Sequence, residues 1–199
     1  MVNHKLFIYT LRSLPNFLWP LKKVIIKSAL KKCGKSVKIG SNVFILNPNL
    51  VKMGDYVFIG DWSSISANVN VSIGNYVMFG PEVMIRGGDH NFSEIGRPMR
   101  FVKTGGKNLP ITIEDDVWIG ARVTILKGVN VGEGAVIGAA SVVTKNILPY
   151  TINVGSPAKP IKTRFTKTQM IHHLRLVFSN YSIEKIIDMY QNNNITFDE

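Results

Sequence analysis

Cysteine is almost absent from this sequence, and its scarcity limits how the fold can be stabilised. Cys33 is the only cysteine among 199 residues, so no disulfide can form within the chain. A chain with a single thiol suits a reducing compartment, and we therefore expect a cytoplasmic protein.

Long apolar runs are absent as well. No stretch approaches the roughly 18 uninterrupted apolar residues that indicate a membrane-spanning helix. The early apolar stretches are interrupted by Lys5, Arg12, Pro15 and Pro20 before the apolar part of a signal peptide could form. Neither a membrane span nor a secretory signal is predicted.

Acidic residues are missing from the N-terminal part of the chain. The first 38 residues contain nine Lys or Arg and no Asp or Glu, whereas the rest carries 15 basic and 13 acidic side chains, so the net charge of +11 is concentrated there. Apolar residues in this part recur at spacings of three, four and seven, which predicts an amphipathic helix broken near Pro15 and Pro20. Such a helix could make peripheral contact with anionic lipid at the inner membrane face, or it could cap the fold. No groove-reading or base-stacking module accompanies the charge, so no nucleic-acid partner is expected.

Histidine is also scarce. His4 lies in the N-terminal arm, His172 and His173 lie near the C-terminus, and His90 alone lies in the central region. A catalytic metal needs several converging ligands, so no metal site is predicted.

What the sequence does contain is a repeat of six residues. One aliphatic residue stands at every sixth position without a miss: Ile113, Ile119, Ile125, Val131, Ile137 and Val143. A second row follows each of these by four positions: Val117, Val123, Val129, Ala135, Ser141 and Ile147. An α-helix repeats near 3.6 residues and a half-buried strand near 2, so neither explains a period of six. A fixed period predicts a solenoid whose coils bury these residues against one another.

The same period occurs upstream with slips of two residues. The series are Ile39, Ile45 and Val51, then Met53, Ile59, Ile65 and Val71, then Ile73, Phe79 and Ile85. Such slips fit insertions at corners, where extra residues do not disturb the stacking. Glycine follows the apolar position at Gly40, Gly54, Gly60, Gly74, Gly80, Gly120, Gly132 and Gly138. We expect these glycines to adopt positive φ so that the chain can turn sharply.

The repeat divides the chain into three parts, with one interruption. Residues 1–36 form the basic helical arm, residues 37–163 the solenoid and residues 164–199 a C-terminal extension of two short helices. The expected apolar faces of these helices are Met170, Ile171, Leu174 and Val177, then Ile183, Ile186, Ile187 and Tyr190. Residues 86–112 break the period and contain His90 among five basic and two acidic side chains. Insertions in a solenoid project outward and often form its binding surface, so this segment is predicted to be a positively charged active-site loop.

Three features together resemble the hexapeptide-repeat acyltransferases. They are the hexads with a broken coil that holds a histidine, the run DDVWIGARVTILKGVNVGEGAVIGAASVVTKN and the exit NVGSPAKPIKTRF. Within that family the chain is most similar to the acetyl-CoA-dependent O-acetyltransferases of sugars and surface polysaccharides, which are related to maltose, galactoside and xenobiotic acetyltransferases. The resemblance covers about residues 37–165. It implies an all-β fold, a left-handed parallel β-helix with three hexads per coil, and a homotrimer with active sites between neighbouring chains.

The resemblance also assigns chemistry to His90, which matches the catalytic histidine of the family. Acetyl transfer to a hydroxyl needs a base that titrates near neutral pH, and histidine suits this role. Asp89, Asn91 and Glu82 are candidates to orient its ring, and the sequence does not choose among them. A backbone N–H near Gly120 or Ala121 would stabilise the oxyanion.

Acetyl-CoA is the implied co-substrate. By the family motif, its binding residues are Trp118, Gly120, Ala121, Gly138, Ala139, Thr144, Lys145, Lys159, Lys162 and Arg164. Candidate acceptor-binding residues are Asn68, Trp62, Arg86 and Arg97. Packing at a corner is the alternative role of Trp118, and solvated surface charge is the alternative for the basic residues.

The predicted function is therefore an O-acetyltransferase that acts on a sugar hydroxyl, on a surface or lipid-linked polysaccharide or its precursor. Alternatives are N-acetylation of an amino-sugar nucleotide, acetylation of an antibiotic, and a non-catalytic trimeric scaffold. The presence of His90 together with Lys159 and Lys162 favours an enzyme.

Overall fold

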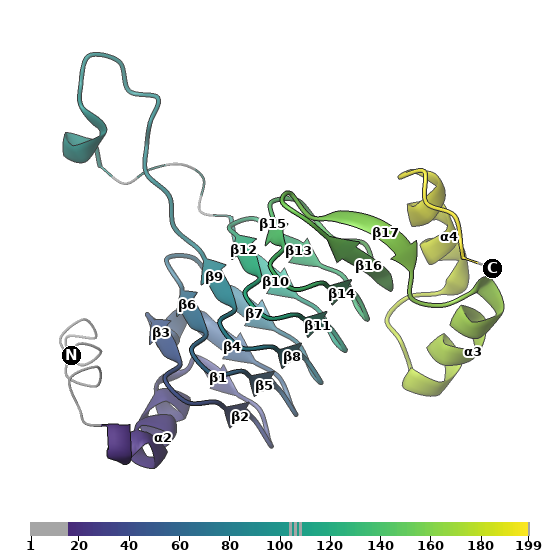
Figure 1. The fold of residues 1–199 in the computed structure, drawn as a ribbon, viewed down its shortest axis with the longest axis horizontal. Coiled ribbons are helices and arrows are strands. Elements are labelled where there is room, and N and C mark those ends of the chain that lie inside the picture. Colours follow the sequence, from purple (N-terminus) through teal and green to yellow (C-terminus); the bar gives the residue numbers. More distant parts are fainter. Residues whose placement is uncertain (1–15, 104, 106, 108, 199) are drawn as a thin grey trace.

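The body of the protein is a stack of coils, each built from three short strands (Figure 1). The computed structural model describes residues 16–198 with the exception of 104, 106 and 108, so the prediction for residues 1–15 lies outside the described residues. Within the coils, strands that follow one another in the chain lie in different sheets, and each pairs in parallel with its counterpart in the next coil. The last two strands of the chain instead form an antiparallel pair within one sheet. The predicted parallel β-helix is confirmed, and its left-handed sense stays a prediction from the resemblance.

Three sheets run the length of the stack. The first contains β1 (Lys32–Cys33), β4 (Val51–Met53), β7 (Val71–Ile73), β10 (Ile111–Ile113) and β13 (Asn130–Val131). The second contains β2 (Lys38–Ile39), β5 (Phe58–Ile59), β8 (Met78–Phe79), β11 (Trp118–Ile119), β14 (Val136–Ile137), β16 (Thr151–Val154) and β17 (Lys159–Thr163). The third contains β3 (Phe44–Leu46), β6 (Ser64–Ser66), β9 (Met84–Arg86), β12 (Thr124–Leu126) and β15 (Val142–Val143). Short 3-10 helices are η1 (Asn16–Leu18), η2 (Pro48–Leu50) and η3 (Met99–Phe101).

The corners are named here by the sheets that they join. The first corner leads from the first sheet to the second, the second corner from the second to the third, and the third corner from the third back to the first. Counterparts in adjacent coils are 20 residues apart in the early coils, as in Lys32 and Lys52, and 18 apart in the late ones, as in Thr112 and Asn130. The two extra residues account for the slips in the sequence pattern.

The two predicted rows form the core. Every residue of both rows between Ile113 and Ile147 is at most 5% exposed. Ser141 is the one hydroxyl among them, and it accepts a hydrogen bond from the N–H of Gly155 at 3.0 Å. Inward aliphatic residues at a period of six are therefore explained by stacking of one coil on the next.

The corner glycines serve a different purpose from the one expected. None of the eight has positive φ, whereas Trp62 and Arg122, two residues after Gly60 and Gly120, have φ of 61° and 60°. A Cβ at Gly60 would lie 2.3 Å from the carbonyl oxygen of Gly80 in the next coil. The prediction of positive φ is wrong, and these glycines are required because stacked backbones approach too closely for a side chain.

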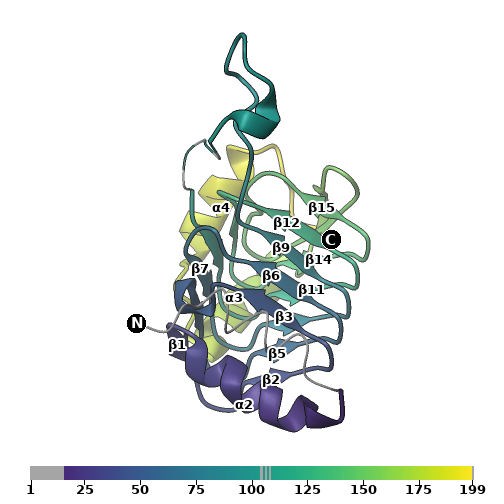
Figure 2. The same ribbon diagram turned by 90° about the vertical axis from the view of Figure 1, so that its left-hand side faces the viewer.

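The N-terminal helix covers one end of the stack. Helix α2 (Trp19–Ala29) lies across the first coil, and Trp19 and Ile26 pack against the core (Figure 2). Pro20 lies in the first turn of α2, where its missing N–H breaks no helical hydrogen bond, so it begins the helix instead of interrupting it as expected. Strand β1 already pairs with β4, so the solenoid begins at Lys32 and not at residue 37.

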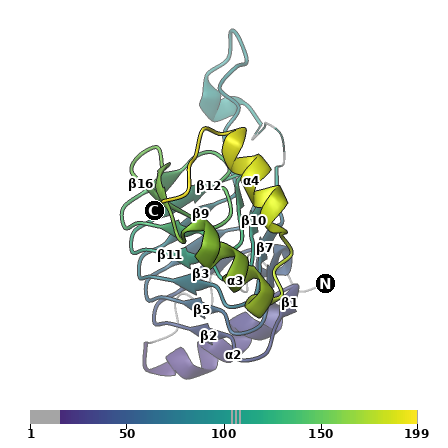
Figure 3. The same ribbon diagram turned by 90° about the vertical axis from the view of Figure 1, so that its right-hand side faces the viewer.

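Two helices cover the opposite end (Figure 3). Helices α3 (Lys167–Val177) and α4 (Ile183–Gln191) pack around Tyr150 through Met170, Leu174, Ile186 and Tyr190. Val177, predicted on the apolar face, is 46% exposed because the helix ends there and the next residue turns to φ 51°. None of the helices in the described ranges is long and apolar enough to cross a bilayer.

Candidate active site

His90 lies on an insertion that leaves the solenoid at the third corner. The insertion occupies residues 87–110, between β9 and β10, and projects away from the stack (Figure 1). A cavity of about 630 Å³ lies at its base. The cavity is lined by Ser66, Asn68, Arg86, Gly87, Gly88, Asp89, His90, Gly105, Lys107 and Lys127. The structure thus brings together three of the predicted site residues, namely His90, Asn68 and Arg86.

Polar contacts between neighbouring coils shape this cavity. Nη1 of Arg86 donates a hydrogen bond to Oγ of Ser66 at 3.1 Å, and the two residues are strand partners in register. A Cβ on Gly88 would lie 2.3 Å from Nδ2 of Asn68. Glycine at this position therefore allows the Asn68 amide to lie beside the start of the loop.

Asp89 fixes the backbone next to His90. Its Oδ1 accepts the N–H of His90 at 2.9 Å, and its Oδ2 lies 3.1 Å from Nζ of Lys127. The hydrogen bond from Lys127, followed by the one from the backbone of His90, lowers the pKa of Asp89, so this carboxylate stays ionised. Lys127 and Ser66 were not predicted as site residues. Counting by coils from Arg86 would have pointed to both. Ser66 is its strand partner one coil back, and Lys127 directly follows Leu126, its strand partner one coil forward.

The three candidates for orienting the His90 ring have other contacts. Oδ1 of Asn91 accepts hydrogen bonds from the backbone N–H and the hydroxyl of Ser93, at 3.1 Å and 2.9 Å. Glu82 forms an ion pair of 3.2 Å at the second corner, away from His90. No hydrogen bond joins the ring to Asp89, Asn91 or Glu82 in the part of the chain that the structure describes. That part also contains no group of three His, Cys, Asp or Glu side chains that could hold a metal ion.

Most of the predicted coenzyme residues lie on the second sheet or at the corner that follows it. They are Trp118, Gly120, Ala121, Gly138, Ala139, Lys159 and Lys162. Trp118 pairs in register with Val136, Val136 with Ile152, and Ile152 with Lys162. Three interstrand spacings separate the first and last of these by about 14 Å. Trp118 is 53% exposed, and Lys159 and Lys162 are also exposed, so an extended ligand with an anionic end can lie along this row. We call it the coenzyme row.

The other three predicted coenzyme residues lie elsewhere. Thr144 and Lys145 follow β15 at the third corner. Arg164 reaches the first corner, where its Nη1 lies 2.7 Å from Oδ2 of Asp116 and 3.1 Å from the carbonyl oxygen of Gly134. The third sheet separates Thr144 and Lys145 from the coenzyme row, whereas Arg164 lies at the corner beside the second sheet, with its guanidinium engaged by Asp116 and Gly134. Arg164 instead fastens the segment after β17 to the stack.

Two predicted acceptor residues also lie apart from His90. Trp62 is 64% exposed at the second corner, beside Glu82 and Arg122. Arg97 lies on the projecting loop, where its Nη1 is 3.8 Å from Oε1 of Glu94. Neither side chain lines the cavity of His90.

The geometry distinguishes the two candidates for the oxyanion donor. The N–H of Gly120 donates to the carbonyl oxygen of Ile137 at 2.7 Å, as the stacking of coils requires. The N–H of Ala121 has no acceptor among the described residues. Of the two candidates, only the N–H of Ala121 is left unused by the stacking of the coils.

Comparison with known proteins defines the family. A family profile described as "Hexapeptide repeat of succinyl-transferase" matches residues 110–145. A protein of Lysinibacillus sphaericus named "Probable macrolide acetyltransferase" is 35% identical over 147 residues, which cover 67% of this chain and 77% of that relative. The chain belongs to the hexapeptide-repeat acyltransferases.

Two further likenesses agree with this assignment. A chloramphenicol acetyltransferase of Klebsiella aerogenes is 47% identical over 74 residues, which cover 37% of this chain and 35% of the relative, so the match spans about a third of that protein. A structure of galactoside acetyltransferase in complex with coenzyme A has a TM-score of 0.71 and 25% identity, with 84% of this chain and 82% of that chain covered.

Proposed function

We propose that this protein is an O-acetyltransferase that moves acetyl from acetyl-CoA to a hydroxyl of a sugar, on a surface or lipid-linked polysaccharide or its precursor. The observation that carries the proposal is the position of His90, in a basic cavity at the base of the loop that breaks the repeat. The galactoside acetyltransferase among the structural relatives supports a sugar acceptor, and its complex supports coenzyme A.

In the proposed reaction His90 acts as general base. It accepts the proton of the acceptor hydroxyl as that oxygen attacks the acetyl carbonyl carbon, and it returns the proton to the sulfur when the carbon–sulfur bond breaks. The free N–H of Ala121 would stabilise the oxyanion, while Lys159 and Lys162 would bind the phosphates of the coenzyme. Direct transfer suffices, because Cys33 lies in the first coil and no serine stands in a Gly-x-Ser-x-Gly motif.

The proposed site needs a second chain. His90 lies at the third corner and Ala121 at the second, so the third sheet lies between them in one chain. On the outer face of the second sheet Phe58, Met78 and Trp118 stand in register and are 44%, 49% and 53% exposed. An exposed apolar row of this kind is typical of a subunit interface. We propose a homotrimer in which this face meets a neighbouring chain and brings the coenzyme row to the neighbour's His90.

Light scattering tests the assembly. The intact protein is expected at the mass of three chains, and Met78→Asp is expected to dissociate it because a carboxylate would be buried in the interface. Leu176→Asp is the matched control, since Leu176 is 64% exposed on α3 at the end of the stack. A monomeric intact protein, or equal dissociation by the control, refutes the proposed interface.

Thiol release from acetyl-CoA tests the activity. Oligosaccharides, sugar nucleotides, chloramphenicol and a macrolide serve as acceptors for the intact protein, for His90→Ala and for the control His172→Ala, an exposed histidine of α3. His90→Ala should lower kcat/KM by about 100-fold or more, as loss of a general base does. If that variant keeps most of the rate, His90 is not the base. A preference for an amine or for an antibiotic as acceptor would assign one of the alternative activities. If none of the acceptors supports thiol release, the non-catalytic scaffold is the interpretation that remains.

The N-terminal helix supports a peripheral membrane contact. Phe17, Leu21 and Val24 are 80%, 53% and 63% exposed on the side of η1 and α2 that does not pack on the core. The only charged residues between residues 16 and 38 are lysines. An apolar stripe among lysines suits an anionic bilayer surface, with each lysine near it contributing about 1 kcal/mol. Flotation with anionic liposomes should therefore recover the intact protein and not Leu21→Asp, whereas Leu176→Asp should float like the intact chain. Equal recovery of all three would refute the contact.

A further inference from the structure

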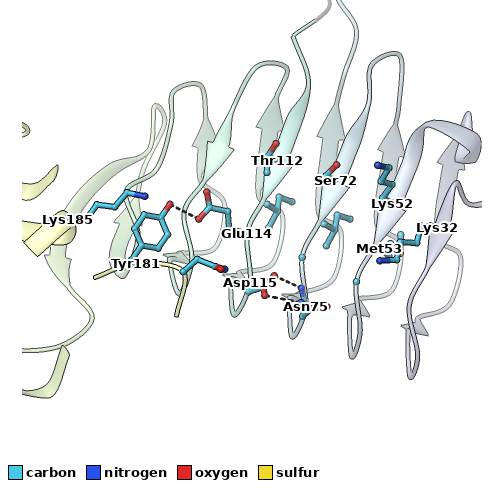
Figure 4. A pocket seen from close by; sticks show the side chains of 15 residues that line it. Lys32, Lys52, Met53, Ser72, Asn75, Thr112, Glu114, Asp115, Tyr181 and Lys185 are labelled. Carbon is cyan, nitrogen blue, oxygen red and sulfur yellow. Dashed lines mark hydrogen bonds between the residues drawn. The ribbon is translucent and has the colours of Figure 1, made fainter. Parts of the chain in front are cut away.

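A second cavity, of about 490 Å³, lies on the outer face of the first sheet (Figure 4). It lies on the opposite half of this sheet from the third corner and His90. Its floor crosses four strands through Lys32, Lys52, Ser72 and Thr112, which are partners in register. Three interstrand spacings make this floor about 14 Å long. One end is closed by Tyr181 and Lys185, from the start of α4 and the segment before it. We call this cavity the lysine groove.

The groups free to bind a ligand in the lysine groove are cations and hydroxyls. Lys32 and Lys52 lie at one end and Lys185 at the other, with Ser72 and Thr112 between them (Figure 4). Within the described residues none of these lysines has a carboxylate within ion-pair distance, and neither hydroxyl has a hydrogen-bond partner. Lys185 lies only over the Tyr181 ring, 4.5 Å from its centre. Ammonium groups and hydroxyls in one groove suit a ligand that carries both anionic groups and hydroxyls.

The two carboxylates of the groove are already engaged by the protein. Oε2 of Glu114 accepts the Tyr181 hydroxyl at 2.8 Å, and Oδ1 and Oδ2 of Asp115 accept the backbone and side-chain N–H groups of Asn75 at 2.8 Å and 2.9 Å. These bonds fasten α4 and the first corner to the sheet. They use part of the hydrogen-bonding capacity of the carboxylates but not their charge, so Lys32, Lys52 and Lys185 leave the groove with one positive charge in excess of Glu114 and Asp115.

A row of polar side chains joins the lysine groove to the cavity of His90. Asn68 lines that cavity, Ser72 lies on the floor of the groove, and Asn70 is exposed between them. The intervening Val69 and Val71 are buried, so Asn68, Asn70 and Ser72 point outward from one segment. Residues 68 and 69 form a bend at the third corner, so Asn68 and Ser72 lie closer together than the ~13 Å that four extended residues would span. An extended chain molecule can therefore occupy both places at once.

We infer that the acceptor is an anionic glycan chain, bearing carboxylate or phosphate groups, that places one hydroxyl at His90 and runs along Asn70 into the lysine groove. The catalytic end of this inference rests on the proposed function, whereas binding in the groove does not require acetyl transfer. The outer face of the first sheet is separate from the apolar row proposed as the trimer interface.

Calorimetry on the full chain without acetyl-CoA tests the inference. The anionic probes are hexagalacturonate and an oligo(glycerol phosphate) of similar length, and maltohexaose is the neutral probe of matched length. At least one anionic probe should bind at least about tenfold more tightly than maltohexaose, and Lys52→Glu and Lys185→Glu should each weaken that binding by about tenfold. Lys52→Arg should keep it within about twofold, because the charge remains.

The matched control is Lys167→Glu, a charge reversal at an exposed lysine of α3 outside the groove. All four lysine variants alter exposed side chains, and circular dichroism verifies that they fold. Equal affinity for neutral and anionic glycans, or no binding of any, overturns the inference. Equal weakening by the control overturns it as well, because the attraction would then come from net charge alone. Since no acetyl-CoA is present, failure here is distinct from failure of the thiol-release assay.

Discussion

Replacing Glu133 with alanine should loosen the C-terminal helices from the solenoid while the coils stay intact. Glu133 is 4% exposed at the first corner of the last complete coil. One of its oxygens accepts the hydroxyl of Tyr150, and the other lies 3.3 Å and 3.4 Å from the backbone and side-chain nitrogens of Asn180. Burial, and then the hydrogen bond to Glu133, raises the pKa of Tyr150, so this hydroxyl keeps its proton and donates.

The size of the effect follows from what the substitution leaves behind. The buried Tyr150 hydroxyl would keep only its contact of 3.3 Å with Oγ of Ser179. An unsatisfied buried donor costs about 1–3 kcal/mol, and part of that is recovered because a buried carboxylate is removed. We expect a net loss of about 2 kcal/mol, or about a 30-fold increase in local opening. Glu133→Gln retains one acceptor oxygen and should cost about 1 kcal/mol.

Hydrogen exchange with peptide resolution measures this opening, because a stack of coils opens in units and a single unfolding midpoint would average over them. Peptides from residues 164–198 of Glu133→Ala should exchange faster, those of Glu133→Gln should be intermediate, and peptides from residues 111–126 should be unchanged. The reasoning fails if both variants exchange like the intact protein, or if the coil peptides accelerate to the same extent as the C-terminal ones.

Three further predictions concern stability and titration. Gly120→Ala should destabilise the protein by about 1–3 kcal/mol in urea unfolding, because its Cβ would lie 2.7 Å from the backbone nitrogen of Ala139; an unchanged midpoint would contradict the close stacking. Lys127→Ala should raise the pKa of Asp89 towards its ordinary value, since the lysine is the main cause of the lowering; carboxyl carbon chemical shifts followed through a pH titration measure this directly. Burial, followed by the charge of Arg164, lowers the pKa of His173, whose Nε2 has no partner in the described part of the chain. As the pH falls below 6.5, His173 therefore takes up a proton in the unfolded chain before it does so in the folded one, and the free energy of unfolding should decrease between pH 7 and pH 5. The decrease should be smaller in His173→Phe, which has no group to titrate at this position.

The solenoid was predictable because stacking imposes a rule on single residues. Inward positions are apolar except for Ser141, and each of the two rows recurs every six residues, so the rows from Ile113 onward specify the core without any distant contact. The same rule misplaced the start of the first coil. Cys33 stands six residues before Ile39 and occupies the inward position of β1, partly buried against the core. A search for aliphatic residues does not find it, because it is a cysteine. The arm was also misjudged at Pro20, because a proline in the first helical turn and one in the interior look alike in sequence.

The functional residues were harder to place because a period of six does not say which corner a residue occupies. Only the full coil, of 18 residues in the late part and 20 in the early part, returns the chain to the same side. Thr144 and Ala121 both follow a hexad position, yet counting by 18 places Thr144 above Leu126, at the corner of His90, and Ala121 below Ala139. Because each coil has three corners, residues from consecutive six-residue units of the motif lie on different sides of the solenoid. A motif that serves one ligand would then be complete only where the sides of two chains meet, which is the physical reason for proposing an active site between neighbouring chains.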